Sequence, residues 1–160
     1  MLCSFSPDEW ENDGQYIDEV VQVLRNLAQV VGRSVGIIAS VDLAHIGPRY
    51  GDSFKPHRGT IEEHLTADRD LLDKIAHCDA SGFMRKIKRE NHARRICGLA
   101  PLYVLAKALE GTARGELLHH AHAVVDNRNS FVTFTSMAFY ECSDGHEIDR
   151  PSHVSNAPER

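Results

Sequence analysis

The stretch from Gly36 to Gly51, GIIASVDLAHIGPRYG, constrains the fold more than any other part of the sequence. Its apolar, partly β-branched start predicts a buried strand over Val35–Ala39. The glycines and the proline that follow indicate a loop, and this loop carries Asp42 and His45. Because sites in α/β domains form where the chain leaves the carboxyl ends of strands, this loop is the first candidate for a functional site.

Asp42 and His45 are three positions apart. If the loop makes one helical turn, the two side chains lie side by side. A carboxylate next to an imidazole fixes the tautomer of the ring and raises its basicity. The alternative is that Asp42 caps a turn and His45 bonds to the loop backbone, and the spacing leaves both interpretations open.

The remaining elements follow from the spacing of apolar residues. Helical spacing predicts a helix from Gln15 to Val31. The other predicted elements are an edge strand at Met1–Phe5, a helix opening at Thr60 with Thr60 and Glu63 as a capping box, a short helix starting at Asp79 or Ser81 and ending near Lys88, a helix with Pro101 in its first turn that ends at Gly111, and an antiparallel hairpin of Glu116–Val125 and Phe131–Tyr140.

This order of elements predicts an α/β layered domain with a mixed sheet flanked by helices. We expect one such domain over residues 1–142. The polar, proline-containing residues 143–160 are expected to form a disordered tail. A sheet that begins at Met1 exposes an edge, so we also expect self-association or a partner that covers that edge.

Composition narrows the class of protein. The net charge of −5 over 160 residues, with both signs interspersed, argues against nucleic acid as a partner. The sequence contains no long apolar run and no signal-peptide pattern at its start, so we expect no membrane association and a cytoplasmic location. The four cysteines should then be reduced, and none forms a Cys-x-x-Cys pair.

Cys97 is the second candidate site residue. It precedes a predicted helix, and Arg94 and Arg95 are close to it in the sequence. A helix N-terminus and nearby cations lower the pKa of a thiol, which favours a nucleophile or a metal ligand. The alternative is a buried structural cysteine.

Three histidines lie in the first predicted hairpin strand. His120 and His122 share one face of that strand and His119 takes the other, so a pair could bind a metal. The favoured alternative is that they cover a half-exposed sheet face. The sequence has no Gly-x-Ser-x-Gly elbow, no glycine-rich phosphate loop and no dinucleotide fingerprint.

Three stretches together resemble the Memo-like family, also called AmmeMemoRadiSam system protein B. IIASVDLAHIGPRYGD resembles the family's SSDLSH-x-G-xx-G segment, and RRICGLAPLYVLAKAL resembles its ICG-xx-P helix start. SFVTFTSMAFYE resembles its final strand. The resemblance extends from Tyr16 to Tyr140.

The resemblance implies a fold related to class III extradiol dioxygenases, which use non-haem iron. Family members build a metal pocket from two histidines of the N-terminal half and one cysteine of the C-terminal half. By match to the motif, that cysteine is Cys97. Asp42 and His45 match pocket-lining residues, and the resemblance implies that His45 acts in acid–base catalysis while Asp42 holds it.

Family members are much longer than this chain, and the half that supplies the two histidine ligands has no counterpart here. The resemblance therefore implies an incomplete or vestigial pocket that binds iron or copper weakly or not at all, since ligand number sets affinity. It also implies a partner that supplies the missing N-terminal half, and a functional link to a radical-SAM protein and an AMMECR-like protein.

Three functions remain open from the sequence. The first is a Memo-like protein whose activity, where present, is that of a metal-dependent, dioxygenase-like oxidoreductase. The second is a non-enzymatic module that binds a protein or peptide in the relic pocket. The third is a Cys–His hydrolase or redox thiol protein. The shared pocket requires that Asp42 and Cys97 lie close together at the carboxyl end of the sheet.

Overall fold

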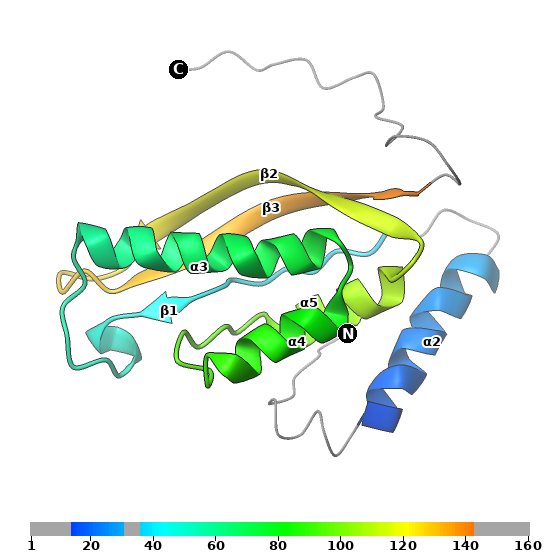
Figure 1. Ribbon diagram of the computed structural model, residues 1–160, viewed down its shortest axis with the longest axis horizontal. Helices are drawn as coiled ribbons and strands as arrows, with labels where there is room; N and C mark the ends of the chain where they lie inside the picture. Colours follow the sequence, from blue (N-terminus) through cyan, green and yellow to red (C-terminus); the bar gives the residue numbers. More distant parts are fainter. Residues whose placement is uncertain (1–13, 31–35, 143–160) are drawn as a thin grey trace, which may run out of the picture.

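The computed structural model describes residues 14–30 and 36–142 (Figure 1). The edge strand predicted at Met1–Phe5 and the tail predicted at 143–160 lie outside the described residues. The elements in chain order are α2 (Gly14–Val30), β1 (His45–Ile46), the 3-10 turn η1 (Pro48–Tyr50), α3 (Arg58–Ala76), α4 (Ala80–Arg89), α5 (Leu99–Leu109), β2 (Ala113–Val124) and β3 (Phe131–Glu141). In this part of the chain, no helix has both the length and the apolar character needed to cross a membrane.

The sheet has the strand order β1-β3-β2, and both pairings are antiparallel. The predicted hairpin is confirmed, because β2 and β3 pair over nearly their whole length. Its turn is held by Asp126, whose Oδ1 accepts the N–H groups of Arg128 and Ser130, each at 2.9 Å. The layered α/β architecture is confirmed too, although the described strands form an antiparallel sheet where a mixed one was expected.

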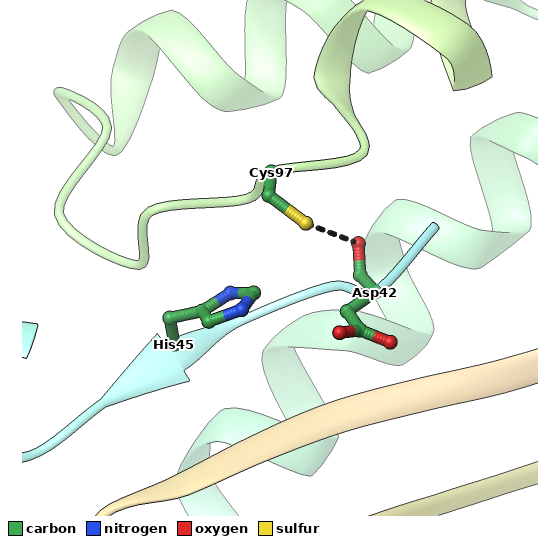
Figure 2. Close-up of side chains that lie close together, drawn as sticks. All are labelled: Asp42, His45 and Cys97. Atoms are coloured by element: carbon green, nitrogen blue, oxygen red, sulfur yellow. Dashed lines mark hydrogen bonds between the residues drawn. The ribbon is translucent and has the colours of Figure 1, made fainter. Parts of the chain in front are cut away.

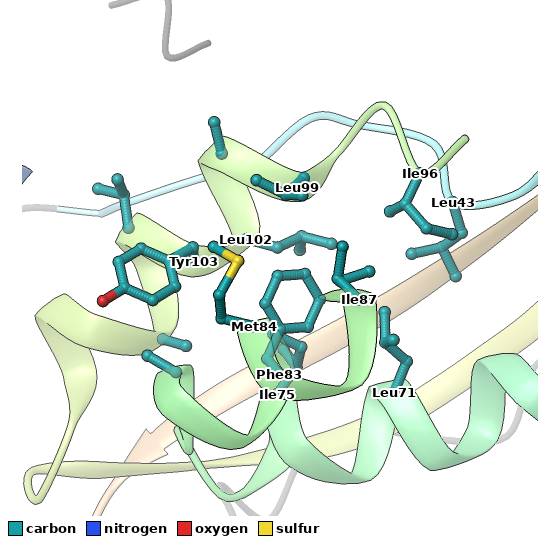
Figure 3. Packing of buried hydrophobic residues seen from close by; sticks show 14 of the residues in the cluster. Leu43, Leu71, Ile75, Phe83, Met84, Ile87, Ile96, Leu99, Leu102 and Tyr103 are labelled. Carbon is teal, nitrogen blue, oxygen red and sulfur yellow. The ribbon is translucent and has the colours of Figure 1, made fainter. Parts of the chain in front are cut away.

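The helices form a layer on one side of this sheet. α3 runs along β2 and β3, α4 packs against α3, and α5 packs against both α4 and α2 (Figure 1). The apolar face of α4 lies at the centre of the core, where Phe83 is fully buried and Met84 and Ile87 are nearly so (Figure 3). On the sheet side, Phe131 and Thr133 are fully buried, as the alternation of β3 predicts.

The start of α3 differs from its prediction. The helix begins at Arg58, and its N-cap is His57 rather than Thr60. The His57 ring accepts the N–H of Thr60 at 3.2 Å, and the Thr60 hydroxyl accepts the N–H of His57 at 3.4 Å. The capping box therefore exists, but an imidazole nitrogen fills the role that the motif assigns to a hydroxyl.

The buried strand predicted at Val35–Ala39 is wrong for the residues that the structure describes. Gly36–Ala39 forms no strand, and Ile38 is 89% exposed. Pairing with β3 starts only where the N–H of Leu43 donates to the carbonyl of Thr133 at 2.9 Å. The apolar pattern indicates only that the side chains of a segment could be buried. A strand also needs a neighbouring strand whose backbone N–H and C=O groups are free to pair with it.

Candidate metal centre

Two segments far apart in the sequence meet at the candidate site. Asp42 lies in the stretch that leads into β1, His45 is the first residue of β1, and Cys97 lies in the loop before α5 (Figure 2). One donor atom from each side chain lies within 4.8 Å of the donor atoms of the other two. The prediction that Asp42 and Cys97 lie close together is confirmed. Their place in the sheet differs, because both ligands of the first segment precede or open β1 and none follows a strand.

A local irregularity explains why Asp42 and His45 face the same way. The N–H of Leu43 donates to the carbonyl of Thr133, and the N–H of Ala44 donates to the hydroxyl of the same residue, each at 2.9 Å. Two consecutive residues thus face one residue of β3, which is the pattern of a β-bulge. In a regular strand, positions three apart point to opposite faces. The extra residue places Asp42 and His45 on one face, and no helical turn is needed to bring them together.

The tautomer of His45 follows from its hydrogen bond. Its Nδ1 lies 3.1 Å from the carbonyl oxygen of Leu43. Since a carbonyl only accepts, Nδ1 carries the proton of the neutral ring, and Nε2 keeps a lone pair. The ring also meets the edge of Tyr50, with ring centroids 4.9 Å apart and perpendicular planes. The carbonyl of Leu43 and the ring of Tyr50 thus orient His45.

Cys97 reaches the site because the residue after it has no side chain. Its thiol is exposed and donates to the carbonyl of Asp42 at 3.5 Å, next to the N–H of Gly98, which donates to the same oxygen at 3.2 Å. A Cβ at Gly98 would lie 2.6 Å from a methyl carbon of Val41 and 2.8 Å from the Asp42 carbonyl oxygen. Glycine is therefore required for this close approach.

The two arginines before Cys97 have other partners. Arg94 is buried, and its guanidinium pairs with Asp68 and, at 2.8 Å, with Glu90. Arg95 pairs with Asp52 at 2.7 Å. Their charges are therefore compensated by carboxylates, so the cations that we expected to activate Cys97 are directed elsewhere.

The buried pair of Asp68 and Arg94 is a feature that sequence reasoning missed. Asp68 is fully buried, and its second oxygen lies 3.2 Å from Nε2 of His120. A signal for it existed, since Asp68 falls on the apolar stripe of α3 between Leu65 and Leu72. A charged residue on such a stripe predicts a buried partner of opposite charge.

The histidines of β2 form no metal centre in the described residues. His120 turns inward to Asp68, while His122 is exposed and meets the edge of Phe131. They share one face of the strand, as predicted, and His119 lies on the other. Within residues 14–30 and 36–142, Asp42, His45 and Cys97 are the only group of three or more metal-ligating side chains whose donor atoms converge.

Asp52 was also missed by sequence reasoning. Its carboxylate accepts the N–H of Gly47 at 2.7 Å and pairs with Arg95. Burial alone would raise the pKa of this carboxyl, but the hydrogen bonds from Arg95 and Gly47 outweigh it and hold the pKa below the ordinary value of 3.8. The sequence around Asp52 indicates only a turn and does not predict these contacts.

A hollow of about 450 Å³ lies elsewhere, between the first half of α3 and the end of β2. Ile61 and Leu65 line it on one side, and His122 and Val124 on the other. It shares no lining residue with the donor group.

The chain is similar in sequence to known proteins of one family. The family model for Memo-like protein matches residues 8–138. A MEMO1 family protein of Thermococcus onnurineus is 26% identical over 133 residues, covering 79% of this chain and 45% of the relative. A MEMO1 family protein of Methanopyrus kandleri is 28% identical over 113 residues, covering 69% of this chain and 35% of the relative.

A MEMO1 family protein of Pyrococcus furiosus is 28% identical over 107 residues, covering 64% of this chain and 36% of the relative. The chain thus spans less than half the length of these curated relatives. The family match covers more than half of the chain and includes all three donor residues. The chain belongs to the Memo-like family.

Proposed function

We propose that this chain binds a divalent first-row transition-metal ion through the thiolate of Cys97, Nε2 of His45 and the carboxylate of Asp42. The observation that carries the proposal is the convergence of three donor atoms within 4.8 Å from two distant segments. A mixed sulfur, nitrogen and oxygen donor set suits iron, copper or zinc rather than magnesium or calcium. Three protein ligands leave coordination positions for a small molecule.

The residues of the site fit such an ion. His45 is held with its Nε2 lone pair free, because Nδ1 donates to Leu43. Cys97 is exposed, so its thiol can lose a proton to solvent when a metal binds. Asp42 is exposed, so its carboxylate oxygens can reach an ion at the surface.

The activity that we propose for this pocket is oxidation of a small molecule by dioxygen, in line with the resemblance to class III extradiol dioxygenases. Bound iron or copper would supply Lewis acidity and electron transfer. The thiolate of Cys97 changes the electronics of the metal relative to an all-nitrogen and oxygen donor set. In this arrangement, His45 serves as a ligand, whereas the resemblance assigns it acid–base work.

The test is metal content of the purified chain, measured by elemental analysis after aerobic and anaerobic preparation. We expect stoichiometric iron, copper or zinc in the wild-type chain and its loss in Cys97→Ala and His45→Gln. The matched control is Cys142→Ser, because Cys142 is another exposed free cysteine, outside the donor group. Metal that persists in Cys97→Ala, or that is equally lost in Cys142→Ser, would contradict the proposal.

A second candidate function is metal-free thiol chemistry by Cys97 with His45 as its base. It is supported by the exposure of the thiol and by the position of a ring nitrogen within 4.8 Å of it. In that case, Cys97 reacts with iodoacetamide at neutral pH faster than Cys142 does, and His45→Gln removes the difference. A rate equal to that of Cys142 in metal-free protein would exclude this alternative.

A further inference from the structure

The geometry of the proposed metal site depends on how two separate segments are held together. Asp42 and His45 belong to one segment, and Cys97 belongs to the other. Two backbone hydrogen bonds join the segments: the N–H of His45 donates to the carbonyl of Arg94 at 2.9 Å, and the N–H of Gly98 donates to the carbonyl of Asp42 at 3.2 Å. Between these bonds lies Arg95, and its side chain adds a third connection.

Arg95 reaches back from the cysteine segment to the histidine segment. Its backbone is left-handed, with φ of 48°, a conformation that a residue with a long side chain adopts only when the surroundings hold it. From this position its Nη1 donates to the carbonyl of His45 at 3.3 Å. Arg95 is two residues before Cys97, so one side chain connects the backbone near both donors.

Asp52 fixes the guanidinium of Arg95 with both carboxylate oxygens. Oδ1 accepts from Nη2 at 2.7 Å, and Oδ2 accepts from Nη1 at 3.3 Å. This bidentate arrangement sets the plane and direction of the guanidinium, which a single contact would not. The Asp52 side chain is 14% exposed, so water competes little for it.

The same carboxylate also holds the far end of β1. Oδ2 of Asp52 accepts the N–H of Gly47 at 2.7 Å, two residues after His45. Gly47 has a φ of 114°, and a Cβ there would lie 2.7 Å from Ser130. Asp52 therefore contacts a residue close to His45 in the sequence and, through Arg95, a residue close to Cys97.

We propose that Asp52 and Arg95 are positioning residues of the metal site, which set the spacing between the donors of His45 and Cys97. The inference rests on the proposed function. The two residues bond to each other and to the backbone at Gly47 and His45, so the pair acts through the backbone of the two ligand segments. It differs from the pair of Arg94 and Asp68, which lies in the core and supports the fold as a whole.

The experiment is a titration of the full chain with Co²⁺, in which the thiolate-to-cobalt absorption band measures binding. The temperature is kept well below the thermal unfolding midpoint of every variant. The variants are Asp52→Asn, Arg95→Gln and the double variant. Partners that orient metal ligands typically change affinity about 10–100-fold, and we expect a loss of at least about tenfold in each single variant. The double variant should bind no more weakly than the weaker single one, because both changes break one connection.

Two further variants separate positioning from general effects. Asp70→Asn is the matched control, since Asp70 forms a surface pair with Lys86 at 3.2 Å and takes no part in the site. It should leave cobalt affinity unchanged. Arg95→Lys keeps the charge but loses the planar fork, so it should stay weak and show an altered cobalt spectrum.

The outcomes distinguish the two proposals. A wild-type chain that binds cobalt while Asp52→Asn and Arg95→Gln bind it with the same affinity and spectrum would overturn the positioning role and leave the metal site in place. Full recovery in Arg95→Lys would also overturn it, because charge alone would then suffice. A wild-type chain that binds no cobalt would overturn the proposed function, and the positioning role with it.

Discussion

The segments Arg94–Gly98 and Gly36–Ala39 both adjoin the stretch that carries Asp42 and His45, but their surroundings differ. Arg94–Gly98 is tied to that stretch by backbone hydrogen bonds, and Arg94 anchors it in the core. Gly36–Ala39 is mostly exposed, with Ile38 at 89%. The polar segment is thus held and the apolar one is not. The two segments differ in their contacts with the rest of the chain, and local hydrophobicity does not predict that difference.

Helix α2 repeats this contrast on its own surface. Ile17 and Val21 are buried on the side that packs towards α5, whereas Tyr16, Val23 and Leu27 are 68%, 64% and 46% exposed. The spacing of these three exposed residues places them on one adjoining stripe. The apolar arc of α2 is therefore wider than the surface that covers it, in a chain that spans less than half of its curated relatives.

The largest effect is expected from removing the anchor of the held segment. Asp68→Ala leaves Arg94 buried with one of its carboxylate partners gone, and breaking such a pair costs about 3–5 kcal/mol. The free energy of unfolding from urea titration should fall by that amount. The exposed Asp70→Ala should change it by less than about 0.5 kcal/mol. Equal losses in the two variants would show that the burial of Asp68 is not what matters.

A glycine in each segment gives the next comparison. Gly98→Ala places a methyl group against Val41 and the Asp42 carbonyl, which should cost about 1–3 kcal/mol and displace Cys97. Gly36→Ala meets nothing within 4 Å, so its effect should be within about 0.5 kcal/mol. Urea titration measures both, and a larger loss in Gly36→Ala would reverse the comparison.

These two segments also show how far the sequence alone could predict the structure. The helices and the hairpin can be predicted from apolar spacing, because their backbone hydrogen-bond partners are close in the chain and the apolar pattern extends over many residues. The strand at Val35–Ala39 does not follow, since its pairing depends on a neighbour that the pattern cannot reveal. Asp42, His45 and Cys97 could be chosen by motif resemblance. The bulge opposite Thr133, which turns Asp42 and His45 to one face, leaves no mark in the spacing.

A smaller effect is expected from acid, through Asp52. Its pKa is held below 3.8, so the ionised, folded form gains stability above that pH and loses it as pH falls through the lowered value. Arg95 is 38% exposed and water screens the pair, so the contribution is on the order of 1 kcal/mol or less.

Urea titrations of wild type and Asp52→Asn between pH 7 and pH 2.5 measure this contribution. The wild-type chain should be the more stable above pH 4, and the difference should shrink below it. A difference that stays constant across this range would show that ionisation of Asp52 adds nothing.

The smallest effect on stability is expected in the exposed apolar residues. Val23→Ser and Ile38→Ser should change the free energy of unfolding by less than about 0.5 kcal/mol, because both side chains are already in water.

The effect of these substitutions should appear in self-association of the chain instead. We expect the wild-type chain to self-associate in light scattering at high concentration, since exposed apolar patches are contact surfaces, and we expect the double variant to be monodisperse. Val21→Ser is the matched control on the covered side of α2, where Val21 is 2% exposed, and it should lower stability without removing the self-association of the folded chain. A monodisperse wild-type chain would mean that this surface is tolerated in water, and that the exposed stripe of α2 is no contact surface for a second copy.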